Sequence, residues 1–348
     1  MKDPLSITDR NKLFDLLTQR EKGDAVPNAE ELREALLSRV RGQDHVVDDM
    51  VKLIRQQKAK TKRDRPVANI LFLGPTGTGK TEMAKALCAS LYGDENHLVR
   101  FDCAELMAQQ GKTRLVGSSR GFAQADQGGE LTRKMHANPN RVVLFDEVEK
   151  ASPDVFDLFL SMMGDGRLQE QGTGRVADFT RSIIVLTSNV EHEPIAEIDN
   201  QIADPYQKLD AIKKHLRNAQ AFRPEILGRF DRIYVFRPLP AEVVAEIIAL
   251  KAIYLARQFD LELEYVDPHV LYEAFEASRK LADFGTREVV RVLDTMFADG
   301  MIAAREAGAQ AIRIEQGETG ELSIVPVAEP AAAAVATRRE FAGAVAQV

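Results

Sequence analysis

The segment Gly74–Thr81, GPTGTGKT, restricts the possible folds more than any other part of the chain. It matches the Walker A pattern GxxxxGK[ST], directly after the apolar run ILFL and before the helical pattern TEMAKALCASL. In this context the glycines let backbone N–H groups surround a phosphate chain, Lys80 can reach the β and γ phosphates, and Thr81 can ligate Mg²⁺. The residues predicted to bind the phosphates are Gly74, Pro75, Thr76, Gly77, Thr78, Gly79, Lys80 and Thr81.

Five short apolar runs predict the strands of one parallel sheet. They are ANILFLG (68–74), HLVRFD (97–102), RVVLFDE (141–147), SIIVLTSN (182–189) and RIYVF (232–236). Continuous apolar runs of this length are expected where helices cover both faces of a sheet. The predicted fold class is therefore α/β, a P-loop parallel sheet with helices on both faces.

The regions on either side of these strands have helical patterns. Residues 9–40 predict two short helices, the second beginning after Asn28, and Asp44 to Gln57 predicts an amphipathic helix. After the last apolar run, helical periodicity continues from Ala241 to about Gly308, and a hairpin is predicted in AIRIEQGETGELSIV. A second, smaller and mainly helical domain is therefore expected.

Composition excludes several classes of protein. With 348 residues, 45% of them hydrophobic, the chain can form two cores. Cys88 and Cys103 lack metal or redox spacing, and the sequence has no signal-peptide or membrane-spanning pattern, so a cytoplasmic protein without membrane contact is expected. Because the net charge is −7, nucleic acid is not an expected partner, although Lys52–Arg65 carries seven basic residues against one acid.

Two adjacent carboxylates, Asp146 and Glu147, end the third apolar run. Ligands bind at the carboxyl ends of strands in open α/β sheets, so both acids are expected beside the P-loop. Asp146 would hold Mg²⁺ together with Thr81, and Glu147 would be the general base that activates water. Asn189, at the end of the next strand, could hydrogen-bond the γ-phosphate or the same water.

The chain resembles the AAA+ ATPases, and specifically the Clp chaperones, over about residues 38–326. The similarity is to the second ATPase module of ClpB and of ClpA. The segments that carry it, in the order found in that family, are VRGQ, FLGPTGTGKTE, RFDCAEL, TRLVGSSRGF, GGELT, VVLFDEVEKASPDVFDLFL, DGRL, TSN, FRPEILGRFD and FGTREVVR.

This resemblance implies that the nucleotide is ATP and that further residues contact it. Val40 and Gly42, within VRGQ, would border the adenine. Arg229, in GRFD, matches the arginine finger that reaches the nucleotide of a neighbouring subunit, and Arg287, in FGTR, matches the second sensor. An arginine supplied across an interface can accelerate hydrolysis by about 10³–10⁵.

Several positions depart from the family pattern. Family members usually have Asn before the finger arginine and an acid three residues after it, where this chain has Gly228 and Arg232, so Arg232 remains an alternative finger. Glu288 follows the sensor arginine in place of the usual proline. Arg41 replaces an apolar residue beside the adenine.

A glycine-rich loop, GSSRGFAQADQGG (117–129), contains a single aromatic residue, Phe122. The family has a tyrosine there, in a Gly-aromatic-Val-Gly loop that faces the central channel and grips the translocating chain. Gly121 and Phe122 are therefore expected to contact substrate, the loop glycines are expected to let it swing, and DGRLQEQGTGR (165–175) is expected to form a second pore loop.

The expected function is a single-module Clp-like ATPase, a ring hexamer that unfolds or remodels protein substrates by threading them through its pore. Coupling to the ClpP peptidase is not expected, because no glycine occurs between Asn189 and Phe222, where protease-linked relatives carry their docking tripeptide. Two alternatives remain open, a nucleotide-dependent assembly scaffold and a DNA-associated motor.

The resemblance also suggests domain limits. An N-terminal helical extension is expected at 1–37, where a partner or adaptor could bind, and a large ATPase subdomain at 38–240. A small lid subdomain would follow at 241–326. The last residues, 327–348, are alanine-rich, and no packed role is assigned to them.

Overall fold

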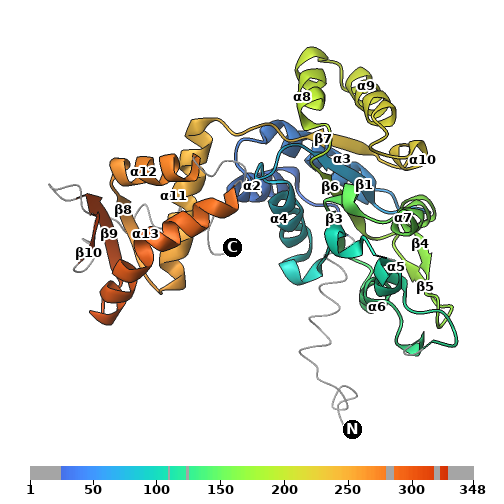
Figure 1. Ribbon diagram of the computed structural model, residues 1–348, viewed down its shortest axis with the longest axis horizontal. Helices are drawn as coiled ribbons and strands as arrows, with labels where there is room; N and C mark the ends of the chain where they lie inside the picture. Colours follow the sequence, from blue (N-terminus) through green and yellow to red (C-terminus); the bar gives the residue numbers. More distant parts are fainter. Residues whose placement is uncertain (1–24, 109, 123–124, 280–285, 317–321, 328–348) are drawn as a thin grey trace, which may run out of the picture. The chain divides into compact units, whose positions relative to one another are not determined.

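The computed structural model describes residues 25–327 except for 109, 123–124, 280–285 and 317–321 (Figure 1). The chain divides into a larger unit that runs to Arg237 and a smaller one that begins at Pro238, with Thr76–Thr78 of the P-loop grouped with the smaller. Within the described residues, no helix is both long and apolar enough to cross a membrane.

A five-stranded parallel sheet forms the centre of the larger unit. The five predicted runs became β1 (Ala68–Leu73), β2 (Leu98–Asp102), β3 (Val142–Asp146), β6 (Ile183–Ser188) and β7 (Arg232–Val235). The strand order is β2-β3-β6-β1-β7, and every neighbouring pair is parallel. The prediction of a parallel α/β sheet is therefore confirmed. The strand that precedes the P-loop, β1, is an interior strand with β6 and β7 as its neighbours.

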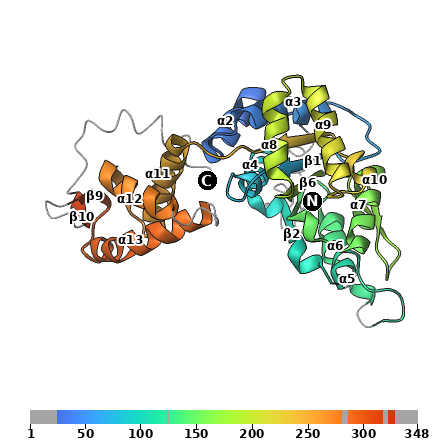
Figure 2. The same cartoon turned by 45° about the horizontal axis from the view of Figure 1, so that its top comes forward.

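Helices cover both faces of this sheet, as the continuous apolar runs predicted (Figures 1 and 2). Along β1, Ile70 and Phe72 point into one core, and Leu71 and Leu73 point into the other. The first core contains α2 (Ala29–Arg39), α3 (Asp44–Lys58) and α4 (Lys80–Tyr92). The second contains α5 (Gln110–Val116), α6 (Glu130–Ala137), α7 (Pro153–Asp165), α8 (His192–Gln201), α9 (Pro205–Asn218) and α10 (Pro224–Leu227).

Shorter elements connect these helices and strands. A two-stranded antiparallel hairpin, β4 (Arg167–Gln169) and β5 (Val176–Asp178), follows α7. The 3₁₀ turns are η2 (Glu95–His97), η3 (Cys103–Leu106), η4 (Ala125–Gln127) and η5 (Val148–Lys150).

The helices before the sheet agree with the sequence analysis where they are described. Asn28 caps α2, and its Oδ1 accepts hydrogen bonds from the backbone N–H groups of Glu30 at 2.9 Å and Glu31 at 3.4 Å. Leu32 and Leu36 of α2 are buried in the core of the larger unit, so the expected extension at 1–37 ends in a helix that belongs to that core. The first predicted helix lies mainly outside the described residues.

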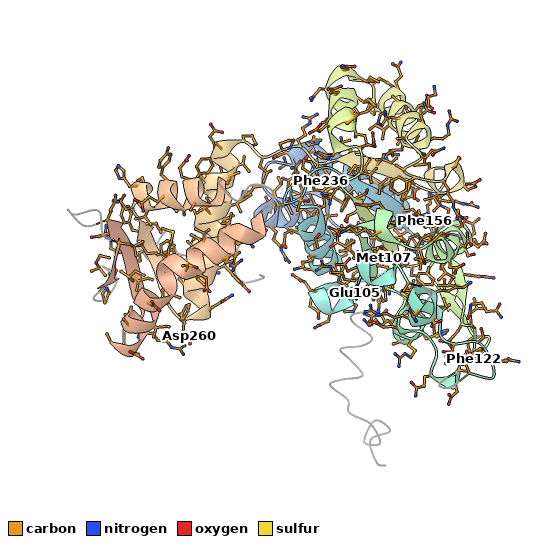
Figure 3. The ribbon with its side chains drawn as sticks, viewed as in Figure 1. Glu105, Met107, Phe122, Phe156, Phe236 and Asp260 are labelled. Carbon is orange, nitrogen blue, oxygen red and sulfur yellow. The ribbon has the colours of Figure 1, made fainter. Side chains whose placement is uncertain are left out.

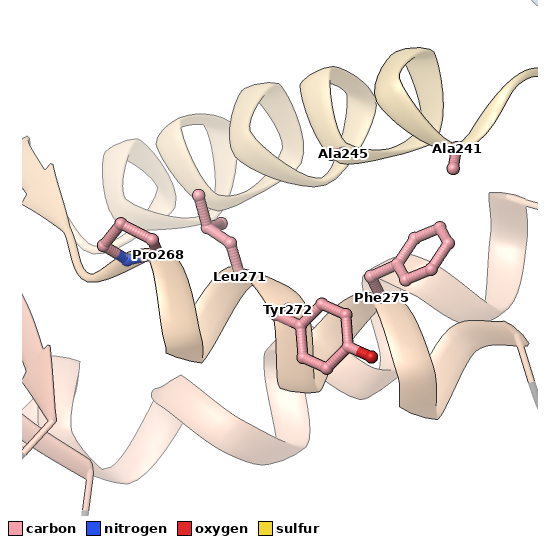
Figure 4. Close-up of a pocket in the computed structure, with 6 residues that line it drawn as sticks. All are labelled: Ala241, Ala245, Pro268, Leu271, Tyr272 and Phe275. Atoms are coloured by element: carbon pink, nitrogen blue, oxygen red, sulfur yellow. The ribbon is translucent and has the colours of Figure 1, made fainter.

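The described residues of the smaller unit form three helices and a three-stranded sheet. The helices are α11 (Ala241–Gln258), α12 (Pro268–Arg279) and α13 (Thr286–Glu306), and the strands are β8 (Glu262–Val266), β9 (Ala311–Gln316) and β10 (Leu322–Val327). The predicted hairpin is confirmed, because β9 and β10 pair antiparallel. The side chains of Ala241, Ala245, Pro268, Leu271, Tyr272 and Phe275 line an apolar groove between α11 and α12 (Figure 4).

The prediction of continuous helical structure from Ala241 to Gly308 was wrong at β8. The segment LELEYV alternates apolar and polar residues, which is the period of a strand with one buried face. Leu261 and Leu263 pack in the core of the smaller unit, and β8 pairs parallel with β9, far along the chain. Leu and Glu are good helix formers, so only this distant partner makes the strand preferable.

Candidate nucleotide site

The P-loop begins at the carboxyl end of β1, and close packing requires glycine at its first position. Gly74 has φ +145°, and a Cβ there would lie 2.4 Å from the backbone oxygen of Phe236. Gly77 and Gly79 also have positive φ, and Gly79 precedes the first residue of α4. This backbone brings a helix N-terminus to the sheet edge, where its N–H groups favour an anion.

Lys80 is nearly enclosed and holds the P-loop together. Its Nζ donates to the backbone oxygens of Gly74 at 2.6 Å and Pro75 at 2.7 Å, and to Oδ1 of Asn189 at 2.8 Å. Burial lowers the pKa of the Lys80 amine to about 8, although the nearby carboxylates of Asp146, Glu149 and Glu147 act in the opposite direction. A phosphate would supply the negative charge that this buried amine otherwise lacks at close range.

Thr81 and Asp146 lie side by side, as the sequence predicted. The Thr81 hydroxyl is 3.1 Å from Oδ2 and 3.3 Å from Oδ1 of Asp146. A hydroxyl and a carboxylate are oxygen donors of the kind that Mg²⁺ prefers, so these two residues fit the ion together with phosphate oxygens. Within the described residues, no cluster of three or more His, Cys, Asp or Glu could hold a metal by itself.

Two residues that the sequence analysis missed orient Asp146. The Arg100 guanidinium on β2 is 2.7 Å from Oδ2, and the Thr187 hydroxyl on β6 donates to Oδ1. Both strands neighbour β3 in the sheet, so their side chains converge on the end of that strand. The available signal for Arg100 was a charged residue in the middle of an otherwise apolar run.

Glu147 occupies a backbone conformation that non-glycine residues seldom adopt. Its φ is +54°, and its N–H donates to the Thr187 hydroxyl at 3.0 Å, so one threonine contacts both carboxylate residues. The Glu147 side chain pairs with Lys150, Nζ to Oε2 at 2.6 Å, and this hydrogen bond raises the pKa of the Lys150 amine. The sequence analysis assigned no role to Lys150.

Asn189 joins the site through Lys80. Besides accepting the lysine hydrogen bond, it donates its backbone N–H to Oε1 of Glu149 at 3.3 Å. The structure thus brings together Gly74, Lys80, Thr81, Asp146 and Asn189, with Glu147 next in the chain.

The segment Val40–Gln43 lies beside the P-loop. A Cβ on Gly79 would lie 3.3 Å from Cγ1 of Val40, which is buried. Gln43 binds the backbone of Arg237 twice, with its Nε2 donating to the carbonyl at 2.9 Å and its Oε1 accepting from the N–H at 3.2 Å. Gly42 has φ +73°, a conformation that favours glycine.

The two candidate fingers differ in what they contact. Arg232 is held within the subunit, with its Nε 3.1 Å from Oδ2 of Asp49. Arg229 follows α10 and is exposed, its guanidinium lies against Gly164, and no described residue forms an ion pair or hydrogen bond with that guanidinium. Arg287 belongs to the first turn of α13, but its side chain lies outside what the structure describes.

The predicted pore residues lie in a projecting loop of the larger unit. Phe122 is 72% exposed, the largest exposed fraction of any phenylalanine described, and Figure 3 shows it beyond α5 and α6 at the outer end of the unit. Gly121, with φ +93°, has no atom within 4 Å of where a Cβ would stand. The segment 165–175 forms β4 and the turn that follows it.

Comparison with known proteins decides the family. Residues 65–233 match the family model described as AAA domain (Cdc48 subfamily). The negative regulator of genetic competence ClpC/MecB from Bacillus subtilis (strain 168) is 39% identical over 245 residues, which is 68% of this chain and 30% of that protein. Chaperone protein ClpB from Oceanobacillus iheyensis is 34% identical over 325 residues, 88% of this chain and 39% of that protein. The chain belongs to the Clp family of AAA+ ATPases.

ClpB from Meiothermus ruber is 36% identical over 301 residues, which is 83% of this Clp-family chain and 34% of that protein. The chain thus spans 30–39% of the length of these curated relatives. The region matched by the family model, residues 65–233, contains the P-loop and the acids at the end of β3. Family membership implies that the chain is an ATPase.

Proposed function

We propose that the site hydrolyses ATP in a Mg²⁺-dependent reaction. Lys80 would contact the β and γ phosphates, and Thr81 with Asp146 would hold the ion, which when bound neutralises charge on the phosphate oxygens. Glu147 would accept a proton from the attacking water, and Asn189 would orient that water or the γ-phosphate. Since the Glu147 carboxylate pairs with Lys150, that ion pair must open before Glu147 can act as a base.

The same reaction would need a second subunit. The Arg229 guanidinium has no charged partner among the described residues and is exposed, which suits a group that completes a site on a neighbouring molecule. Arg232 is already paired with Asp49, which makes it the weaker candidate. The proposed assembly is a homo-oligomeric ring, a hexamer, in which Arg229 acts in trans, Arg287 acts as the second sensor of its own subunit, and Val40 and Gly42 border the adenine.

We further propose that the ring remodels proteins by threading a polypeptide through its centre. The observation that carries this proposal is the exposed ring of Phe122, which lies on a projecting loop of polar, glycine-rich sequence. Burying such a ring would gain about 1.5–3 kcal/mol, so its exposure favours a role in contact with another molecule. An aromatic ring contacts any passing side chain, which suits a substrate of variable sequence.

A pair of substitutions tests the threading proposal. The assay is unfolding of a fluorescent protein that carries an unstructured tail, with ATP hydrolysis and ring assembly measured on the same samples. Phe122→Ala should reduce unfolding at least tenfold while the ring still forms and hydrolyses ATP, and Phe122→Tyr should retain unfolding. Unfolding by Phe122→Ala at the parental rate would exclude Phe122 as the gripping residue.

The two alternative functions predict different results. A nucleotide-dependent scaffold would bind its partner when ATP is bound, whether or not hydrolysis follows. Blocking hydrolysis would therefore leave partner binding intact. A DNA-associated motor would need the basic run 52–65, but part of it is engaged internally: Lys58 lies 5.2 Å from the Tyr92 ring centre, and Arg65 pairs with Asp231. Stimulation of hydrolysis by double-stranded DNA would favour that alternative.

Independence from ClpP and partner recruitment by the N-terminus belong to the same proposal. The region between Asn189 and Phe222, which lacks glycine, consists mainly of the ordered helices α8 and α9. It offers no flexible glycine-centred docking tripeptide. Residues 1–24 precede the core helix α2 and are the part of the chain proposed to bind an adaptor or partner protein.

A further inference from the structure

Two loops of the larger unit meet around one buried carboxylate, Glu170. This residue is 2% exposed and begins the turn between β4 and β5. Its Oε1 accepts hydrogen bonds from the Thr132 hydroxyl at 2.6 Å and the Gly129 N–H at 3.3 Å, and its Oε2 accepts one from Thr173. Although burial alone would raise the pKa of Glu170, the hydrogen bonds from Thr132 and Thr173 outweigh it and lower that pKa.

The glycines at the neck of the loop 117–129 are packed too closely for any side chain. A Cβ on Gly128 would lie 2.0 Å from Oε1 of Glu170, and one on Gly117 would lie 2.9 Å from the carbonyl carbon of Gly128. A Cβ on Gly129 would lie 2.0 Å from the backbone oxygen of Leu115. The neck is therefore closed onto the carboxylate, and these three glycines permit close contact, whereas the sequence analysis expected them to let the loop swing.

Further hydrogen bonds join the body of the loop to the turn 170–175. The Ser119 hydroxyl donates to Oε1 of Gln171 at 3.1 Å, and Arg120 donates through Nε to the backbone oxygen of Gly172 at 3.1 Å. The Gln171 N–H donates to the backbone oxygen of Val116 at 3.0 Å. The two segments are thus connected both at the neck and near the aromatic residue.

We propose that Glu170 is a positioning residue that fastens the loop 117–129 to the turn 170–175. We call this connection the loop clamp, and it makes both proposed pore loops move as one body. This inference rests on the proposed threading function, because it explains how Phe122 would transmit force. An ionised carboxylate that fastens several donors in a buried site is costly to separate from them. Phe122 would then be displaced together with the hairpin.

The chain itself links this loop clamp to the nucleotide site. Asp146 and Glu147 end β3, α7 follows after η5, and β4 begins directly after Gly166, which ends α7. Gly166 is tightly packed, since a Cβ there would lie 3.1 Å from the Cα of Arg65. A shift of the acids during hydrolysis would therefore reach the hairpin through one helix and a packed junction.

Hydrogen exchange on the assembled, full-length protein tests the clamp without any substrate. In Glu170→Ala the amides of residues 117–129 should exchange at least tenfold faster than in the parent, and Glu170→Gln, which keeps one acceptor oxygen, should restore part of the protection. Gln169→Ala is the matched control, because Gln169 is exposed and its side chain donates within the hairpin, to the backbone oxygen of Gly174. Unchanged exchange in Glu170→Ala would overturn the proposal.

Cross-linking tests whether the two segments move together. Cysteines at Ser119 and Gln171 can be joined by a short bifunctional thiol reagent, while the native Cys88 and Cys103 are fully buried. In a protein with Ser119→Cys and Gln171→Cys, the cross-link should leave the rate of unfolding of the tailed fluorescent protein as it was before the reagent. Glu170→Ala should slow that unfolding, and the same cross-link should restore it. If the reagent stops unfolding, the segments move independently and the clamp is wrong. If the parent protein unfolds nothing, the threading function fails, and the exchange result still decides the clamp.

Discussion

The buried amine of Lys80 should make the empty protein less stable at neutral pH than it would be without that charge. Burial lowers the pKa of Lys80 from 10.5 to about 8. Each pKa unit corresponds to about 1.4 kcal/mol, so the protonated amine in the empty site costs about 3 kcal/mol at pH 7. Lys80→Met removes this cost, although it also removes three hydrogen bonds, which adds an offset that does not depend on pH.

The sign of the pH dependence separates these two contributions. Between pH 8 and 10.5 the unfolded chain binds a proton at Lys80 that the folded chain has released, so the free energy of unfolding of the parent rises with pH through this window. Between pH 7 and pH 10.5, the free energy of unfolding of the parent should rise by about 3 kcal/mol more than that of Lys80→Met. Urea unfolding at each pH, without nucleotide, measures this difference in the free energy of unfolding. Lys85→Met, on the same helix, is the control and should show the same pH dependence as the parent.

Nucleotide binding gives an independent measurement of the same group. Phosphate binding favours the protonated amine, so ATP affinity should be constant below pH 8 and fall about tenfold per pH unit above it, to about 30-fold weaker at pH 9.5 than at pH 7. Titration calorimetry across this range measures the dissociation constant. A constant affinity up to pH 9.5, together with a flat stability difference, would refute the assignment of a depressed pKa to Lys80.

Three further variants probe other parts of the proposal. Glu147→Gln should bind ATP normally and lose at least 100-fold in turnover, measured by phosphate release, since general-base catalysis contributes about 10²–10⁴. Arg229→Ala should bind ATP without hydrolysing it, and mixed rings with Lys80→Ala should regain part of the ATP turnover. Arg232→Ala should still hydrolyse ATP. If Arg232→Ala loses hydrolysis and Arg229→Ala keeps it, Arg232 is the finger. Deletion of residues 1–24 should spare ATPase activity and reduce substrate capture, measured by pull-down, because the core helix α2 is retained.

The core of the candidate nucleotide site was predictable because its residues are local in sequence or lie at strand ends. The Walker A segment specifies its own strand, loop and helix, and parallel strands bring Asp146 and Asn189 to the same edge of the sheet. Arg100 and Thr187 could not be assigned in this way, because their contacts with Asp146 depend on which strands are neighbours. Strand order is a property of the whole sheet that no short pattern contains.

The strand β8 shows a different limit of sequence patterns. Its residues alternate as a strand should, yet they lie between two helices and include good helix formers. The pairing partner, β9, lies about 45 residues away along the chain, and the free energy of that pairing is invisible in a local window. The long parallel runs of the central sheet were easier to predict because they are apolar on both faces and cannot remain exposed.

The glycines of the loop 117–129 show why the role of a glycine depends on its surroundings. In sequence, a glycine can signal conformational freedom or an approach too close for a side chain, and the two have opposite mechanical consequences. Gly121 has open space around it, but Gly117, Gly128 and Gly129 are packed against backbone or against Glu170. The free energy of unfolding of a typical domain is about 5–15 kcal/mol. A freely swinging loop would move before it transmitted the force needed to unfold such a domain. In the proposed threading mechanism, a closed neck would let Phe122 pull on the hairpin behind it. Rigidity at the base and freedom at the tip would then both suit a loop that grips a polypeptide.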